Sequence, residues 1–149
     1  MSHQITKEYH FSAAHMILGH PKCGRMHGHN YRVEVTLEGP LIGPQNWILD
    51  FGQMDELVKP IIESLDHRFI LTYAEEVNGA KSLWHATNSG HEHLAAIDAP
   101  SSSAESLAEW IASRLPKALV PGFAVSVCKV VVWETAKACG IWVRDNTTR

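Results

Sequence analysis

The stretch His27-Gly-His-Asn-Tyr-Arg-Val-Glu-Val-Thr-Leu37 decides the fold class of this chain. From Tyr31 onward, apolar residues alternate with polar ones, which is the period of a β-strand with one covered face. His27 and His29 share the parity of Tyr31, so we expect both imidazoles on the covered side if no bulge intervenes. The sequence therefore predicts a strand over residues 27–37 that begins with two histidines on one face.

The segments around this strand predict a small sheet and two helices. Further extended segments are expected at residues 4–15, 47–50, 123–134 and 140–144. A first helix is indicated by apolar residues at helical spacing, namely Met54, Leu57, Val58, Ile61, Ile62 and Leu65. A second helix is expected from Ser102, because Ser102-x-x-Glu105 has the form of a capping box. The expected order, apart from the short strand at 47–50, is strand, strand, helix, helix, strand, strand, which predicts an α+β domain. Its antiparallel four-stranded sheet would carry both helices on one face.

Composition indicates a single globular domain over residues 1–149, with 45% hydrophobic and 19% charged residues. A net charge of −3 and the lack of a basic stripe argue against nucleic acid as a partner. No run approaches the roughly 18 apolar residues of a membrane span, and the first residues lack an apolar signal region. We therefore expect a cytoplasmic protein with no membrane partner. Residues 72–100 show no consistent period and are expected to form a long irregular insertion, which is more often functional or an interface than idle.

Ten histidines make a metal site the first functional question. His27 and His29 at i and i+2 on a strand can share one metal, although they also fit two strand-end histidines with ordinary hydrogen bonds. His15, at the end of Phe11-Ser-Ala-Ala-His15, is the natural third ligand on a neighbouring strand. Three imidazoles with an open fourth position are typical of catalytic zinc. A second histidine cluster, at His85 and His91-Glu-His93, lies in the aperiodic insertion and is a much weaker candidate.

Cys23 has two interpretations that the sequence leaves open. Cys23-x3-His27-x-His29 could itself supply three ligands to a structural zinc, which would leave His15 free. Alternatively, Lys22 and Arg25 beside the thiol favour its thiolate form, which could act as a general base next to the metal. Cys128 and Cys139 are expected to be thiols without a function, since three scattered cysteines do not form a disulfide framework.

Two further groups are candidates for proton transfer and ring recognition. Asp66 and His67 follow the first helix directly and could form a proton relay, or serve as an ordinary helix end and turn. Glu134 ends the apolar run Val130-Val-Val-Trp-Glu134. A carboxylate there could accept two donors from the edge of a guanine or pterin ring, or it could be the first solvated residue after the strand.

Together these pieces resemble the 6-pyruvoyltetrahydropterin synthase / 6-carboxytetrahydropterin synthase family over nearly the whole chain. The segments that carry the resemblance are Phe11-Ser-Ala-Ala-His15, Cys23-Gly-Arg-Met-His-Gly-His-Asn-Tyr31, Trp47-Ile-Leu-Asp-Phe51, Leu65-Asp-His-Arg-Phe69 and Trp133-Glu-Thr135. The resemblance implies the tunnelling fold, in which sheets of several subunits close into a barrel as trimers that pair into hexamers. Active sites would then lie at subunit interfaces.

The resemblance also implies a role for each candidate residue. Zinc would bind His15, His27 and His29, and Cys23 would accept a proton. Asp66 and His67 would relay the second proton, and Glu134 would anchor the pterin ring. The Cys23-x3-His27-x-His29 spacing resembles the 6-carboxytetrahydropterin synthases of the queuosine (7-deazaguanine) pathway. These convert 7,8-dihydroneopterin triphosphate to 6-carboxytetrahydropterin with loss of triphosphate and acetaldehyde.

The substrate contacts and the departures from the family pattern leave alternatives. Lys22 and Arg25 are candidate contacts for the triphosphate, since a net acidic protein needs local cations to bind a polyanion. Ser102-Ser103-Ala104-Glu105 stands where the family has Pro-Thr-x-Glu, and Ser103 keeps the hydroxyl that would meet the pterin. Residues 72–100 are also longer than in the compact queuosine enzymes. A 6-pyruvoyltetrahydropterin synthase, or a non-catalytic homologue that binds zinc or a pterin, remains the alternative.

Overall fold

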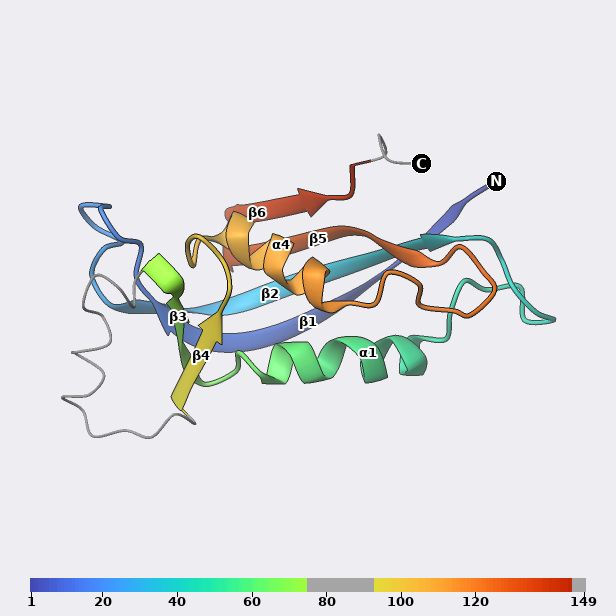
Figure 1. Cartoon of the computed structure of the whole chain (residues 1–149), viewed down its shortest axis with the longest axis horizontal. Coiled ribbons are helices and arrows are strands. Elements are labelled where there is room, and N and C mark those ends of the chain that lie inside the picture. Colours follow the sequence, from blue (N-terminus) through green and yellow to red (C-terminus); the bar gives the residue numbers. More distant parts are fainter. Residues whose placement is uncertain (75–92, 146–149) are drawn as a thin grey trace.

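Two long antiparallel strands form the centre of the molecule (Figure 1). The computed structural model describes residues 1–74 and 93–145. Strand β1 spans His3–His15 and strand β2 spans His27–Gly39, and they pair in unbroken register from His3↔Gly39 to His15↔His27. The two extended segments expected at residues 4–15 and 27–37 are therefore confirmed.

Four shorter strands extend this pair into a six-stranded sheet with the order β4-β3-β1-β2-β5-β6. They are β3 (Arg68–Thr72), β4 (Leu94–Ile97), β5 (Ser126–Thr135) and β6 (Ala138–Val143). β5 and β6 were expected and pair antiparallel, whereas β3 pairs parallel with β1, and β4 pairs parallel with β3.

The predicted four-stranded antiparallel sheet is therefore wrong: the sheet has six strands and mixed direction. Strands β3 and β4 have five and four residues, which is too few for a period-2 pattern to emerge. β4 lies inside the segment 72–100 that was expected to be wholly irregular. The strand expected at residues 47–50 is reduced to an isolated bridge between Ile42 and Trp47.

Within the described residues, each of the two helices begins at a capping residue. α1 (Phe51–Glu63) follows Asp50, whose carboxylate accepts from the Gly52 N–H at 2.7 Å. α4 (Ala104–Arg114) follows Ser103, whose hydroxyl accepts from the Ser106 N–H at 3.4 Å. The capping box expected at Ser102 is wrong by one residue. The Ser102 hydroxyl is buried and donates to the Met16 carbonyl at 3.1 Å instead.

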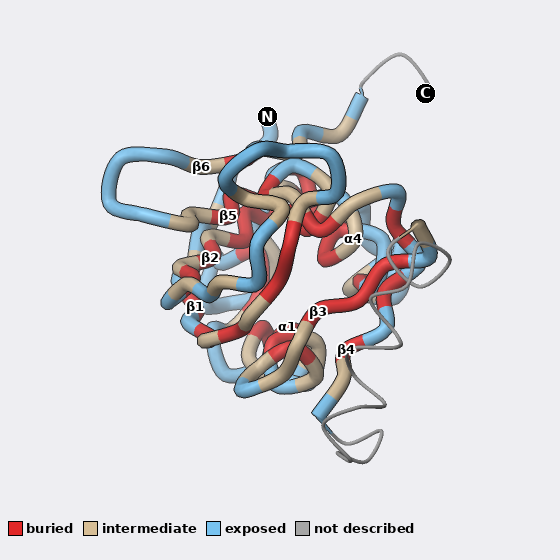
Figure 2. Tube along the Cα trace, turned by 90° about the vertical axis from the view of Figure 1, so that its left-hand side faces the viewer, coloured by how far each residue is buried: buried red, intermediate tan, exposed pale blue. Residues whose placement is uncertain are grey.

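Both helices pack on the same face of the sheet, as expected. Figure 2 shows that buried residues line the inside of the curled sheet, facing α1 and α4. A single cluster of buried side chains joins the elements that flank the helices and the central strands. Its members include Tyr9, Phe11, Tyr31, Val33, Val35, Met54, Val58, Leu107, Ile111, Val130 and Val132. The odd-numbered positions of β2 therefore face the core, which is the side on which the two strand-end histidines were expected.

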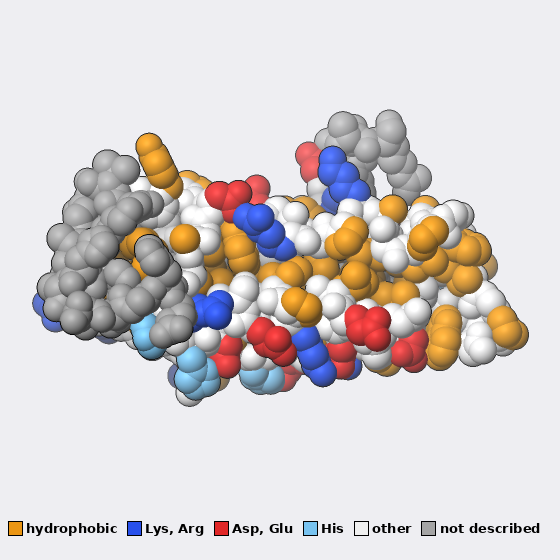
Figure 3. Space-filling view, turned by 60° about the horizontal axis from the view of Figure 1, so that its bottom comes forward, with side chains coloured by type: hydrophobic (Ala, Val, Ile, Leu, Met, Phe, Trp, Pro, Cys, Tyr) orange, Lys and Arg blue, Asp and Glu red, His pale blue; other side chains and the backbone are white. Residues whose placement is uncertain are grey.

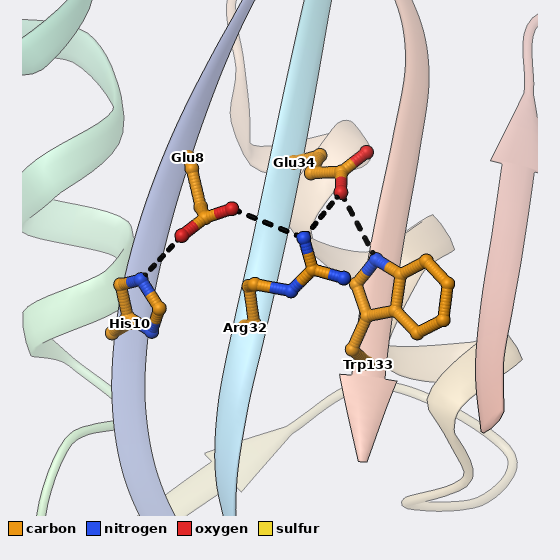
Figure 4. Close-up of polar contacts among 5 residues, drawn as sticks. All are labelled: Glu8, His10, Arg32, Glu34 and Trp133. Atoms are coloured by element: carbon orange, nitrogen blue, oxygen red, sulfur yellow. Dashed lines mark hydrogen bonds and ion pairs between the residues drawn. The ribbon is translucent and has the colours of Figure 1, made fainter. Parts of the chain in front are cut away.

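The opposite face of the sheet is polar and partly exposed to solvent. Arg32 joins the carboxylates of Glu8 (3.1 Å) and Glu34 (2.9 Å), and its guanidinium lies over the Trp133 ring at 4.5 Å (Figure 4). His10 Nε2 lies 2.7 Å from Glu8, and the Trp133 indole donates to Glu34 at 3.2 Å. The Arg32 guanidinium holds the pKa of the Glu8 carboxyl below its usual value.

The outer surface carries charges of both signs. In the view of Figure 3, acidic and basic side chains are interspersed along the lower part of the described surface, and hydrophobic side chains lie between and above them. Within residues 1–74 and 93–145, neither helix has the length and hydropathy needed to cross a membrane.

Candidate metal centre and active site

The antiparallel register of β1 and β2 brings three histidines together. His15 is the last residue of β1 and pairs with His27, the first residue of β2, while His29 pairs with Ala13. The ring centroids of the three imidazoles are 4.6, 5.1 and 5.0 Å apart. One ligand nitrogen from each ring lies within 4.8 Å of the other two. The three histidines can therefore share one metal ion.

Backbone carbonyls fix the tautomers of two of these rings. Nδ1 of His15 lies 2.9 Å from the Ser102 carbonyl oxygen, and Nδ1 of His27 lies 2.6 Å from the Arg25 carbonyl oxygen. A carbonyl oxygen only accepts hydrogen bonds, so each Nδ1 carries the proton and donates it. The lone pair of each ring is then on Nε2, which is the arrangement of a metal-binding histidine held by a second group.

The burial of His15 provides a test of whether a metal fits. The side chain is 1% exposed, and within the described residues its Nε2 has no hydrogen-bond partner. Burial lowers the pKa of His15 to about 4, and the neighbouring His27 and His29 contribute to the same shift. The ring is thus neutral near pH 7, and a buried lone pair without a donor fits a bound cation.

Cys23 is held in the loop between β1 and β2 by backbone hydrogen bonds. Its N–H donates to Nδ1 of His20 at 2.8 Å, and its carbonyl accepts from the Ile17 N–H at 2.7 Å. The thiol is half-buried and does not belong to the group of ligand atoms formed by the three histidines. This geometry favours three imidazole ligands over a set that includes Cys23.

Asp66 and His67 form the pair that the sequence indicated. His67 Nδ1 lies 2.8 Å from Asp66 Oδ2, and Asp66 Oδ1 accepts from the Ser12 N–H at 2.8 Å. The hydrogen bond from Ser12 is the main reason why the pKa of Asp66 lies below its usual value. His67 adopts φ +55°, and its side chain is 83% exposed. The imidazole therefore faces solvent, with its Nδ1 against the Asp66 carboxylate.

A shallow depression of about 570 Å³ lies at this end of the sheet. It is lined by residues of β1, β2, β3 and their ends, among them His29, His67 and His93. Cys23 and Glu134 do not line it. The described part of the chain thus does not gather every candidate residue around one cavity. Of the second histidine cluster, only His93 belongs to the described residues; His85, His91 and Glu92 lie outside them.

Glu134 lies beside the metal centre near the end of β5. Its Oε1 is 3.9 Å from Nε2 of His15, and the side chain is 27% exposed. Lys22 and Arg25 are both exposed, and Ser103 occupies the cap of α4. The structure thus brings Glu134 close to the triad and leaves the two cations in the loop at the surface.

Two groups near the centre were missed from the sequence. The Ser102 carbonyl, which orients His15, is a backbone group for which no residue pattern gives a signal. Tyr31 shares the parity of His27 and His29, and this signal could have placed its hydroxyl near the site. The Tyr31 ring meets the His29 ring edge-on at 5.3 Å between centroids.

A model of the 6-pyruvoyl tetrahydropterin synthase family matches residues 4–144. The chain belongs to this family. A relative from Pyrococcus horikoshii, whose provisional name is 6-carboxy-5,6,7,8-tetrahydropterin synthase, is 33% identical over 138 residues, covering 89% of the chain and 83% of the relative. The 6-carboxy-5,6,7,8-tetrahydropterin synthase of Aquifex aeolicus is 29% identical and covers 91% of the chain and 94% of its own length. A match to a Methanocaldococcus jannaschii relative, at 46% identity, spans 61 residues and only 37% of that relative.

Solved structures agree on the fold. An uncharacterised protein from Wolinella succinogenes superposes with a TM-score of 0.80 at 21% identity, covering 97% of the chain and 99% of that protein. The 6-pyruvoyl tetrahydropterin synthase of Plasmodium vivax superposes with a TM-score of 0.74 at 23% identity, with coverage of 97% and 99%. The predicted tunnelling fold is therefore confirmed. The prediction of an enzyme of the 6-pyruvoyl/6-carboxytetrahydropterin synthase type, a lyase, is confirmed at the level of the family.

Proposed function

We propose that this chain is a zinc-dependent 6-carboxy-5,6,7,8-tetrahydropterin synthase. Its substrate would be 7,8-dihydroneopterin triphosphate, and it would release triphosphate and acetaldehyde in the queuosine (7-deazaguanine) pathway. The observation that carries the proposal is the triad of His15, His27 and His29, in which two rings present Nε2 lone pairs and His15 is buried without a donor. The names of the relatives from Pyrococcus horikoshii and Aquifex aeolicus support the choice of product.

Zinc bound to the triad would supply a Lewis acid next to the side-chain hydroxyls of the substrate. The chain's own residues would then move the protons. Cys23 would accept one as general base, and His67 would handle the second. Asp66 favours this role of His67, because its carboxylate lies 2.8 Å from Nδ1 and can orient the ring.

Recognition of the substrate is assigned to groups on either side of the triad. Glu134 would accept the amino and N–H donors of the pterin edge, and the Ser103 hydroxyl would provide a further contact to the ring. Lys22 and Arg25 are exposed cations in the loop that carries Cys23, which suits a flexible triphosphate. The domain proposed to do this work spans residues 1–149.

We also propose that the chain works as a cytoplasmic homo-oligomer, with trimers that pair into hexamers. Strands β4 and β6 are the two edges of the curled sheet, and Ile141 and Val143 of β6 are 50% and 62% exposed. An open edge with exposed apolar residues favours pairing with another sheet. Association would also explain why the described part of one chain leaves Cys23 and Glu134 outside the depression that His67 lines.

Mass spectrometry of the products tests the proposal directly. Zinc-loaded protein is incubated with 7,8-dihydroneopterin triphosphate, and Cys23→Ala is run in parallel. The expected products are 6-carboxytetrahydropterin, triphosphate and acetaldehyde, and the variant should form them far more slowly. A 6-pyruvoyl product would instead make the chain a 6-pyruvoyltetrahydropterin synthase with the same site. Absence of turnover with pterin binding retained would indicate a non-catalytic homologue.

A further inference from the structure

The Tyr31 hydroxyl is a buried polar group that the proposed chemistry does not use. Tyr31 is 0% exposed, and within residues 1–74 and 93–145 its hydroxyl has no hydrogen-bond partner. Its ring is fixed by stacking on Phe11, with centroids 4.6 Å apart, and by edge-on contacts with His29 at 5.3 Å and His15 at 6.0 Å. A buried hydroxyl normally has a partner, so an unpaired one beside a candidate active site points to a ligand.

Glu134 is the neighbour of Tyr31 across the sheet. Arg32↔Trp133 is the last pair between β2 and β5 at this end, and Tyr31 and Glu134 are the next residue on each strand. The Tyr31 phenol is a hydrogen-bond donor and a carboxylate only accepts, and the charge of Glu134 acts on the phenol, which places the two side chains near each other. Among the described residues, the Glu134 carboxylate accepts no hydrogen bond, and its Oε1 lies 3.9 Å from Nε2 of the neutral His15 ring. A fixed donor and a fixed acceptor thus lie side by side, both without a hydrogen bond.

We propose that Tyr31 is a specificity-determining residue, which donates a hydrogen bond to the 4-oxo oxygen of the pterin ring. The inference rests on the proposed function, since it assigns the ring edge that Glu134 faces. The edge of a 2-amino-4-oxo ring presents an amino donor, an N–H donor and then a carbonyl acceptor in sequence. Glu134 accepts from the two donors, and Tyr31 donates to the acceptor. A 2,4-diamino ring places an amino donor against the phenol O–H, which loses its acceptor, and it has no N–H at the middle position, so Glu134 loses one of its two donors as well.

The test compares the binding of two rings to wild type, Tyr31→Phe and Tyr9→Phe. The probes are neopterin and its 2,4-diamino counterpart, titrated by pterin fluorescence into zinc-loaded protein at a pH where the diamino ring is unprotonated. Tyr9→Phe is the matched control, because Tyr9 is a buried tyrosine of the adjacent strand whose hydroxyl donates to Asp55 at 3.2 Å. Wild type and Tyr9→Phe are expected to prefer neopterin by about tenfold or more. Tyr31→Phe is expected to bind neopterin about tenfold more weakly and to show a smaller preference for it than wild type, the remaining preference coming from the N–H that Glu134 accepts.

Other outcomes overturn the inference in distinguishable ways. Equal weakening of both rings in Tyr31→Phe would mean that the hydroxyl only positions Glu134, and unchanged binding would mean that it has no role. A wild type that binds both rings equally overturns the inference without any variant. A wild type that binds neither ring contradicts the proposed function itself. Zinc content and Tm are measured on each protein: Tyr31→Phe should keep its zinc and its Tm, because it removes a hydroxyl without a partner, whereas Tyr9→Phe should lower the Tm.

Discussion

The Nδ1–H of His15 donates to the carbonyl oxygen of Ser102, 2.9 Å away, although the two residues are 87 positions apart in the chain. This hydrogen bond ties the end of β1 to the segment that precedes α4. The Ser102 hydroxyl strengthens the same connection, since it donates to the Met16 carbonyl at 3.1 Å. The tautomer of a candidate metal ligand therefore depends on where α4 begins.

Removal of one imidazole should abolish metal binding. His15→Ala is expected to lose nearly all bound zinc, because two imidazoles on an exposed strand end form a much weaker site. Zinc per chain is measured by elemental analysis after dialysis against a weak chelator. His10→Ala is the matched control, since His10 lies on the same strand with its side chain on the exposed face. Full zinc content in His15→Ala would exclude the triad as the metal site.

Removal of the Cys23 thiol should separate catalysis from metal binding. Cys23→Ala is expected to keep its zinc and to lose turnover by roughly 10²–10⁴-fold, which is the usual contribution of a general base. Zinc content and the rate of triphosphate release are measured on the same preparation. Loss of zinc together with activity would instead support a structural site in which Cys23 is a ligand.

A methyl group at Gly140 should disturb the start of α4. Gly140 is buried in β6, and a Cβ there would overlap backbone atoms of Ala104 and Glu105. Overlap with backbone is not relieved by a side-chain rotation, so Gly140→Ala is expected to destabilise the protein by about 1–3 kcal/mol. Because Ala104 follows the segment that holds His15, zinc affinity should fall as well. Denaturant unfolding and zinc titration measure both effects, and Ile141→Ala on the same strand, at a half-exposed position, should leave zinc affinity unchanged.

The metal-free protein should lose stability as the pH falls from about 6.5 to about 4. The pKa of His15 is about 4 in the folded chain and 6.5 in an unperturbed histidine. Between these values the unfolded chain binds the proton and the folded chain does not, so the free energy of unfolding decreases as the pH falls. The full difference corresponds to about 3 kcal/mol. Denaturant unfolding at a series of pH values measures it, and the same slope in His15→Gln would contradict the assignment to His15.

The long strands and the grouping of His15, His27 and His29 could be predicted from the sequence, whereas the edge of the sheet could not. The alternation from Tyr31 to Leu37 extends over enough residues to fix one covered face, and it also fixes the side on which His27 and His29 lie. β3 and β4 pair parallel with strands that are distant in sequence, and their four or five residues carry no readable period. The helix cap was misplaced by one residue because Ser102 and Ser103 are chemically alike. Only the tertiary contact of Ser102 with Met16 distinguishes them.

The candidate site could also be predicted only in part from the sequence. Residue types and spacing gave the three histidines and the Asp66–His67 pair, because metal ligands and acid–base pairs leave a pattern in the sequence. The role of the Ser102 carbonyl leaves none, since every residue has the same backbone group. Tyr31 and Glu134 are brought near each other by the register between β2 and β5, whose last pair at this end is Arg32↔Trp133, and these strands are almost a hundred residues apart in the chain.

The register between β1 and β2 has a consequence for how such sites can diversify. The ladder from His3↔Gly39 to His15↔His27 sets the spacing of the imidazoles, and the connection of residues 16–26 adds the Arg25 carbonyl that orients His27. That connection carries Cys23, Lys22 and Arg25, so insertions, deletions or substitutions there can reposition these candidate acid–base and anion-binding groups while the three histidines stay in place. The paired strands β1 and β2 can thus stay unchanged while the connection between them varies. One metal centre could in this way serve several reactions on related substrates.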